Sequence, residues 1–168
     1  MRAVIQRVAW AKVEVDGEVV GAIDRGLLVY LGAGLGDNAE ARAYVLSKII
    51  GLRIFDNENG KMDKSVVDIA GALLVVSQFT LYGDVRRGRR PSFDSAMPPE
   101  QAEEAYNAFV VAARAHGIRV ETGKFRASMK VMSLNDGPVT IWIDSGHATT
   151  GGAAQQFAGL RRSKRPLI

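Results

Sequence analysis

The stretch ALLVVSQFTL, residues 72–81, is the most strongly apolar segment of the chain and sets the pattern of the fold. A continuous apolar run of this kind is typical of a strand buried at the centre of a sheet. Three hydrogen-bonding side chains, Ser77, Gln78 and Thr80, then interrupt the run. We therefore predict a central strand over residues 72–81, with Ser77 and Thr80 beside backbone groups at its end.

The segments on either side predict a sheet built largely from hairpins. Residues 3–15 alternate well enough for a strand, Asp16-Gly17 is a two-residue hairpin signal, and residues 18–23 supply the returning strand. Further strands are expected at 27–31, 118–122, 130–134 and 139–143, and residues 52–55 with the turn over 56–60 suggest a second strand pair.

Two amphipathic helices are expected beside this sheet. Asn38 can cap a helix over residues 39–50, and Pro98-Pro99 can start a second helix that runs to residue 115 and ends at Gly117. Many hairpin-joined strands with two such helices predict the α+β class. We expect a single compact domain with a mostly antiparallel, barrel-like sheet.

Composition narrows the class of protein further. The 168 residues are 47% hydrophobic and 24% charged, close to the average of folded single-domain proteins. The absence of cysteine excludes disulfides, thiolate chemistry and Cys-rich zinc sites. Neither a signal peptide nor an apolar run long enough to cross a bilayer is seen, so we expect a cytoplasmic protein that does not associate with membranes.

The net charge of +4 is concentrated at one end of the chain. Residues 146–168 contain four basic residues and no acidic one, so residues 1–145 carry equal numbers of both signs. The terminal segment also lacks periodicity. We therefore predict one domain over residues 1–145, followed by a basic and mostly disordered tail over residues 146–168.

A second basic feature is the loop GDVRRGRRPSF, which begins at Gly83. It places four guanidinium groups within five positions, at Arg86, Arg87, Arg89 and Arg90. Their mutual repulsion favours either a phosphate backbone as counter-charge or a solvated loop, and the sequence does not separate these two interpretations.

Several familiar chemistries are not supported. The glycine cluster at 32–36 lacks the spacing of a dinucleotide fingerprint or a P-loop. His116 is expected in the last turn of a helix and His147 in the tail, so neither suits a catalytic triad, and no metal-binding motif is present. An enzyme with this sequence would use hydroxyls, backbone dipoles or a group of its substrate, without a metal or cofactor.

Two motifs carry a resemblance to a known family. SQFTL at 77–81 and NDGPVT at 135–140 each have a bland interpretation alone, as a strand with polar residues and as a tight turn. In this order and separation they resemble the signature motifs of D-aminoacyl-tRNA deacylases, also called D-tyrosyl-tRNA(Tyr) deacylases. The resemblance extends over MRAVIQRV, GLLVYLGAG, LRIFDNENGKM, RRGRRPSF and TGKF, about residues 1–145, and the tail departs from it.

The resemblance implies an enzyme of translation quality control. Family members hydrolyse the ester that joins a D-amino acid, and also glycine on tRNA(Ala), to the terminal ribose of tRNA, and they leave L-aminoacyl-tRNA intact. They are homodimers in which a Gly-Pro motif enters the active site of the other subunit. Here Gly137 and Pro138 would form a cis pair that excludes L side chains, and Arg7 would orient them. Phe125 and Met129 would line the adenosine end of the pocket.

The resemblance also implies catalytic candidates in the SQFTL segment, namely Ser77, Gln78, Phe79 and Thr80. Gln78 would orient the substrate, and a backbone N–H of Phe79 or Thr80 would donate to the oxyanion. Thr80 has two competing roles: it could be the nucleophile, or it could only hydrogen-bond while the 2′-OH of the ribose assists. We prefer the second role because no histidine is placed to act as the base.

The arginine loop would then contact the phosphate backbone of tRNA. Two other functions remain open: a non-catalytic protein that binds tRNA or another RNA, and an esterase for small D-amino acid esters.

Overall fold

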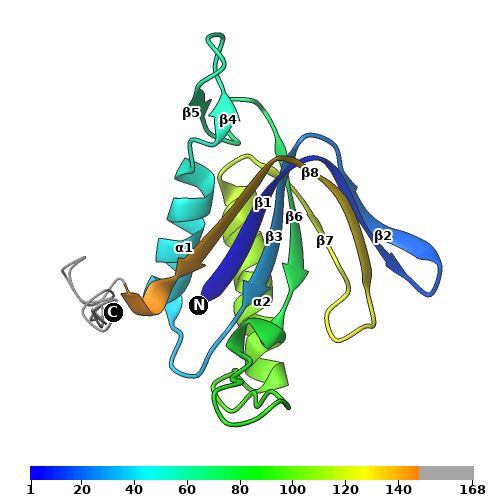
Figure 1. Ribbon diagram of the computed structural model, residues 1–168, viewed down its shortest axis with the longest axis vertical. Coiled ribbons are helices and arrows are strands. Elements are labelled where there is room, and N and C mark those ends of the chain that lie inside the picture. The colour runs from blue at the N-terminus through cyan, green and yellow to red at the C-terminus, as the bar shows by residue number, and fades with distance from the viewer. Residues whose placement is uncertain (148–168) are drawn as a thin grey trace, which may run out of the picture.

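The computed structural model describes residues 1–147, so the part of the predicted tail from residue 148 lies outside the described residues. The chain forms one six-stranded sheet with two helices (Figure 1). The elements in chain order are β1 (Arg2–Val15), β2 (Glu18–Ile23), β3 (Gly26–Gly32), α1 (Ala39–Gly51), β4 (Phe55–Asp56), β5 (Met62–Lys64), β6 (Ala72–Ser77), the 3-10 helix η1 (Phe79–Tyr82), α2 (Pro99–Ala115), β7 (Arg119–Thr122), β8 (Lys130–Asp144) and the 3-10 helix η2 (Ser145–His147).

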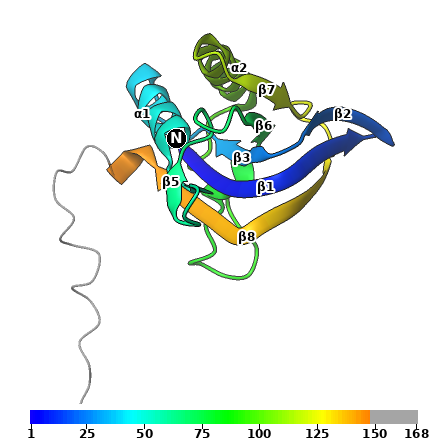
Figure 2. The same ribbon diagram turned by 90° about the horizontal axis from the view of Figure 1, so that it is seen from above.

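The strand order is β2-β1-β3-β6-β7, with β8 also paired to β1. β1 pairs antiparallel with β2, β3 and β8, whereas β3–β6 and β6–β7 are parallel. The sheet curls strongly (Figure 2). A Cβ added to Gly21 of β2 would lie 2.2 Å from the Thr122 oxygen of β7, so the two ends of the sheet almost meet. The predicted α+β fold with a mostly antiparallel, barrel-like sheet is confirmed.

Both helices cover one face of the sheet (Figure 2). Asn38 caps α1 as predicted, because its side-chain oxygen accepts a hydrogen bond of 2.9 Å from the Ala41 N–H. Leu73 and Val75 of β6 join the core under the helices, whereas Leu74 and Val76 join a second core on the other face of the sheet. β6 is therefore the central strand, buried on both faces, that its apolar sequence predicts.

The central strand is shorter than predicted. β6 ends at Ser77, and residues Phe79–Tyr82 turn as η1. The neighbouring strand β3 ends at Gly32, and the Gln78 N–H makes one more bond to the Leu31 carbonyl at 2.8 Å. Beyond that point the backbone bonds locally, with the Gly83 N–H donating to the Thr80 carbonyl at 3.0 Å.

NDGPVT is not the hairpin turn that we expected between two strands. Residues Lys130–Asp144 form the single strand β8 along β1. Asn135 faces Val8 and Thr140 faces Gln6, so four residues of β8 bulge out opposite Arg7. A bulge accommodates the proline, which has no N–H for the ladder.

The strand pair expected from residues 52–55 with a turn over 56–60 is present as the short antiparallel hairpin of β4 and β5, although its first strand is shifted to Phe55–Asp56. This hairpin projects from the top of the molecule in Figure 1. The last described element, η2, spans Ser145–His147. No helix within residues 1–147 is long and apolar enough to cross a membrane.

Candidate active site

A cavity of about 670 Å³ opens where the parallel strands β3 and β6 end. Ligands commonly bind at this end of parallel strands. Its lining residues come from four places: the strand ends (Leu31, Ala33, Val76, Ser77, Gln78, Phe79), the segment before α2 and its first turns (Phe93, Ala96, Met97, Pro98, Pro99, Ala102, Tyr106), the loop after β7 and the start of β8 (Phe125, Arg126, Ala127, Met129, Val131), and Met1.

Two polar side chains of this cavity come from the SQFTL segment, and Arg126 and Tyr106 supply others. Ser77 and Gln78 are half-buried at its wall, and Phe79 is 57% exposed. The N–H groups of Phe79 and Thr80 begin η1, so they have no acceptor within that helix. Of these two residues, Phe79 lines the cavity and Thr80 follows it in the chain.

Thr80 itself does not line the cavity. Its hydroxyl accepts a hydrogen bond from the Gln78 side-chain amide, and an amide cannot take up a proton as a base would. His116 caps the far end of α2, and His147 ends η2. The environment of the Thr80 hydroxyl within residues 1–147 therefore favours a hydrogen-bonding role over that of nucleophile.

Phe125 and Met129 line the apolar side of the same cavity. The Phe125 ring lies 5.8 Å from the Tyr106 ring, and the Tyr106 hydroxyl donates to the Val75 carbonyl at 2.8 Å. Burial raises the pKa of Tyr106 to about 12, so this phenol stays neutral. A Cβ at Gly123 would lie 2.6 Å from the Met129 sulfur, so the glycine makes room for Met129.

Arg7, Gly137 and Pro138 lie outside this cavity. The Gly137–Pro138 bond is cis, as the resemblance implied. Arg7 is 7% exposed and holds the bulge of β8: its Nε donates to the Asp136 carbonyl at 3.1 Å, and its Nη1 donates to the Ile54 carbonyl at 2.7 Å. The structure thus brings Arg7 to the Gly-Pro motif, and brings neither to the pocket of the same chain.

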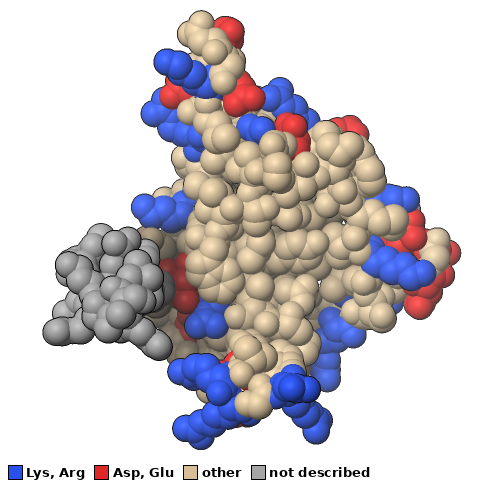
Figure 3. Space-filling view, in the orientation of Figure 1, with Lys and Arg blue, Asp and Glu red and all other residues tan. Residues whose placement is uncertain are grey.

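The arginine loop lies beside the cavity. Arg86 and Arg87 border a second hollow of about 520 Å³ that is lined also by Asp84, Asp94, Ser92 and Ser95. Hydrogen bonds from Arg86 lower the pKa of Asp84 to about 2, so Asp84 stays ionised and its negative charge offsets the positive charge of Arg86. Arg87, Arg89 and Arg90 are exposed. Lys and Arg side chains gather at the lower end of the molecule, where the green loop after η1 lies in Figure 1 (Figure 3).

Sequence reasoning missed one whole wall of the cavity. Phe93, Met97 and Ala102 line it together with Phe125 and Met129, and their ring, thioether and methyl groups make this lining apolar. Pro98-Pro99 marked this place in the sequence, but only as a helix start. The T-shaped contact between the Phe79 and Phe93 rings, with centroids 4.9 Å apart, joins this wall to the SQFTL segment.

Comparison with known proteins shows the family of the chain. The family model of D-Tyr-tRNA(Tyr) deacylase matches residues 4–144. The D-aminoacyl-tRNA deacylases of Thermosipho africanus and Koribacter versatilis are each 59% identical over 145 residues, which cover 86% of this chain and 97% of the relative.

Two solved structures are also similar. One, titled c-Myc DNA Unwinding Element Binding Protein, is 46% identical, with a TM-score of 0.81 over 86% of this chain and 98% of its own. A probable eukaryotic D-amino acid tRNA deacylase is 19% identical, with a TM-score of 0.72 over 85% and 98%, and shows the shared fold.

The curled sheet with two helices on one face, and a largely apolar pocket beside the SQFTL segment at its strand ends, define a small single-domain α+β protein of the deacylase type. The chain belongs to the D-Tyr-tRNA(Tyr) deacylase family.

Proposed function

We propose that this protein is a D-aminoacyl-tRNA deacylase, an enzyme that hydrolyses the ester between a D-amino acid and the terminal ribose of tRNA. Relatives that match 86% of the chain at up to 59% identity are named for this activity. The observation that carries the proposal is the pocket at the end of β6, which is largely apolar and is lined by Ser77, Gln78 and Phe79 of the SQFTL segment.

The reaction is an addition of water to the ester carbonyl. The water oxygen bonds to the carbonyl carbon, the carbonyl oxygen becomes an oxyanion, and the bond to the ribose oxygen then breaks as that oxygen takes a proton. The N–H of Phe79 or Thr80 donates to the oxyanion, and each such donor contributes about 3 to 4 kcal/mol to the transition state. Gln78 and Ser77 orient the substrate at the strand end.

The terminal ribose 2′-OH assists this reaction in place of a protein base. The support is the Thr80 hydroxyl, which is engaged by the Gln78 amide rather than by a base. A Thr80→Ala variant is expected to retain activity, whereas a substrate with a 2′-deoxy terminal nucleotide is expected to react much more slowly. An inactive Thr80→Ala variant, with normal turnover of the deoxy substrate, would show that Thr80 is the nucleophile.

Phe125 and Met129 bind the terminal adenosine. Both side chains are apolar, and both line the cavity from the loop between β7 and β8. An aromatic ring and a thioether together provide a surface on which the adenine base can stack. The aminoacyl ester then reaches the SQFTL end of the same cavity.

The chiral filter is the Gly137-Pro138 motif of a second copy of the chain, so the active form is a homodimer. The motif lies outside the cavity of its own chain, and β8, which bears it, pairs with β1 along one edge only. Trp10, Leu134 and Trp142 on these two strands are between 41% and 50% exposed, which suits a surface that a partner covers.

Backbone groups of this motif face the α-amino group of the substrate. A D side chain, or the hydrogen of glycine, points away from them, whereas an L side chain meets backbone held by Arg7. The same geometry admits glycyl-tRNA(Ala). Dilution to verified monomers should abolish activity, and a fully active monomer would refute the arrangement.

The exposed Arg87, Arg89 and Arg90, with Arg86, contact the phosphates of tRNA near the pocket mouth. The deacylase domain comprises residues 1–145, the basic residues after it are at most an accessory contact, and the enzyme acts in the cytoplasm, where its substrate is.

One assay decides among the possible functions. D-Tyr-tRNA, L-Tyr-tRNA and D-Tyr methyl ester are each incubated with the protein and the release of tyrosine is measured. We expect hydrolysis of D-Tyr-tRNA alone. Cleavage of the methyl ester would indicate a small-molecule esterase, and salt-sensitive binding of tRNA without cleavage would indicate an RNA-binding protein.

A further inference from the structure

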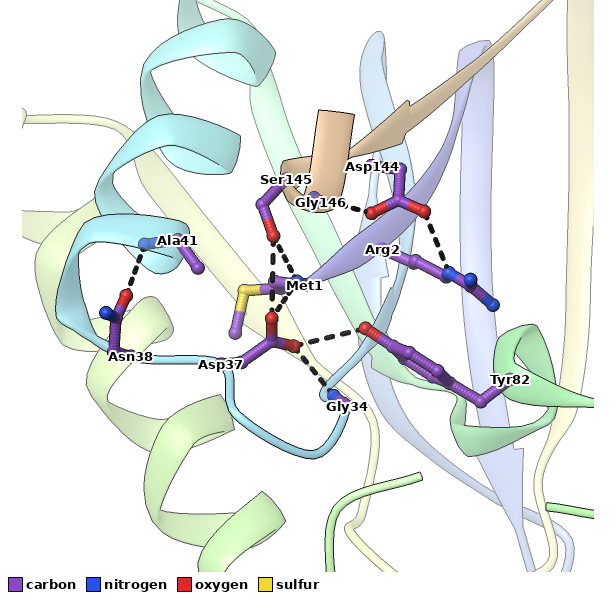
Figure 4. Close-up of polar contacts among 10 residues, drawn as sticks. All are labelled: Met1, Arg2, Gly34, Asp37, Asn38, Ala41, Tyr82, Asp144, Ser145 and Gly146. Atoms are coloured by element: carbon purple, nitrogen blue, oxygen red, sulfur yellow. Dashed lines mark hydrogen bonds and ion pairs between the residues drawn. The ribbon is translucent and has the colours of Figure 1, made fainter. Parts of the chain in front are cut away.

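The α-ammonium group of Met1 lies inside the fold, between the loop after β3 and η2 (Figure 4). It donates to Asp37 Oδ1 and to Ser145 Oγ, and Met1 as a whole is 2% exposed. The Ser145 N–H donates back to the Met1 carbonyl at 2.9 Å. This group is therefore a buried cation with defined partners.

Asp37 links that cation to the candidate active site. Its second oxygen, Oδ2, accepts hydrogen bonds from the Gly34 N–H at 2.7 Å and from the Tyr82 hydroxyl at 3.1 Å (Figure 4). Burial and the nearby Asp37 charge raise the pKa of Tyr82, so its phenol remains a neutral donor. Tyr82 is the last residue of η1, the turn that begins with Phe79 and Thr80.

The Tyr82 ring is fixed on two sides. A Cβ on Gly34 would lie 2.3 Å from a ring carbon, so the loop after β3 packs directly against it. On another side the Arg2 guanidinium lies 4.4 Å from the ring centroid, and its Nη1 donates to the Leu81 carbonyl at 3.0 Å. The first two residues of the chain thus hold the second half of η1.

We propose that the free α-ammonium of Met1 is a positioning group for the reaction: through Asp37 and Tyr82 it holds η1 so that the Phe79 and Thr80 N–H groups face the substrate. An acyl group on this nitrogen, or a residue before Met1, abolishes the effect. The inference rests on the proposed location of the reaction at η1.

The physical reason is charge balance in a confined place. Acylation turns the ammonium into a neutral amide and leaves the Asp37 carboxylate, which is 13% exposed, without its cation. A preceding residue keeps a charge but displaces it by about 3.8 Å, beyond contact with Asp37. In either form the Met1 nitrogen becomes a neutral amide, so we expect the Asp37 carboxylate to turn toward solvent and to weaken its bond to Tyr82.

Three forms of the full chain test the proposal: one with a free Met1 amine, one Nα-acetylated, and one with a glycine before Met1. The kcat for D-Tyr-tRNA is expected to fall at least tenfold in the second and third forms, with KM changed less than twofold. Hydrogen exchange of the Gly83 amide, which bonds to the Thr80 carbonyl, is expected to become at least tenfold faster.

Coupling through Asp37 is tested in an Asp37→Asn background, where acetylation should lower kcat by less than a further twofold. Tyr82→Phe, which keeps the ring and removes the bond to Asp37, serves in the same cycle if Asp37→Asn does not fold. Asp24→Asn, which removes an exposed acidic group elsewhere, is the matched control and should respond to acetylation like the unmodified sequence.

The outcomes separate the two proposals. Unchanged exchange at Gly83 in the acetylated form, or additive effects of acetylation and Asp37→Asn, would overturn the positioning role. Faster exchange with unchanged kcat would support positioning and refute the location of the reaction at η1. Failure of the free-amine form to hydrolyse D-Tyr-tRNA would refute the proposed function itself.

Discussion

Replacing Arg7 with methionine should disable the proposed chiral filter. Arg7 Nη1 and Nε satisfy the carbonyls of Ile54 and Asp136, at 2.7 Å and 3.1 Å. An unsatisfied buried acceptor costs about 1 to 3 kcal/mol, which applies to the buried bond of the Ile54 carbonyl, whereas the bond to the exposed Asp136 contributes less. The ion pairs to Asp56 and Asp136, at 3.5 Å and 3.4 Å, add less than about 1 kcal/mol because both acids are half exposed.

We expect Arg7→Met to lower the midpoint of urea unfolding and to reduce kcat/KM for D-Tyr-tRNA by at least a factor of about 100, which corresponds to about 2.7 kcal/mol. Discrimination against L-Tyr-tRNA should shrink as well. Asp56→Asn is the matched control, because it removes one exposed ion-pair partner and leaves both carbonyl bonds. Its effect on stability should stay below about 1 kcal/mol.

A subunit-mixing experiment shows whether the filter acts across the dimer. The Arg7→Met subunit keeps an intact pocket but has a disordered Gly-Pro motif, whereas the Gln78→Ala subunit keeps an intact motif but has an impaired pocket. Mixed dimers should regain part of the activity that each variant lacks alone. If Arg7→Met keeps its rate and its discrimination while its stability falls, the positioning argument for Arg7 is refuted.

Three further predictions follow from packing and charge. Gly26→Ala should lower the free energy of unfolding by about 3 kcal/mol or more, because the new Cβ would lie 2.0 Å from the Ala72 oxygen. Gly51→Ala, where a Cβ meets open space, should leave this free energy unchanged or raise it by up to about 1 kcal/mol. Chemical denaturation of the two variants measures both values. Phe109→Ala should cost about 3 to 5 kcal/mol in the same assay, since this side chain is fully buried; a cost under 1 kcal/mol would contradict its place in the core. The contact between Asp84 and Arg86 should be complete above the ordinary carboxyl pKa and be lost as the pH falls through about 2, because the folded pKa is depressed; a carboxyl NMR titration should show the Asp84 pKa rising in Arg86→Ala, and an unchanged value would refute the pairing.

Local sequence predicted most of the elements. The apolar run that begins at Ala72, the Asp16-Gly17 turn and the Asn38 cap each act through contacts within a few residues, so their signals are readable from the chain. The wrong predictions concern segments whose structure depends on pairing with a neighbouring strand. The chain leaves the ladder after Gln78 because β3 ends, and residues 135–140 stay in one strand because β1 continues beside them. Neither fact is visible in the segment itself.

The sequence by itself determined the family, the class of fold and the two motifs, because residue types and spacing carry that information directly. It could not show that Phe93 and Met97 wall the cavity, or that Met1 and Asp37 form an ion pair 36 positions apart, because such contacts depend on how the sheet curls. Tertiary structure also decided that Arg7 meets the Gly-Pro bulge at a distance from the pocket of its own chain. The sequence determines which residues are present. The curvature of β1 and β8 determines that Arg7 contacts the Gly-Pro bulge and that both lie away from the pocket of their own chain.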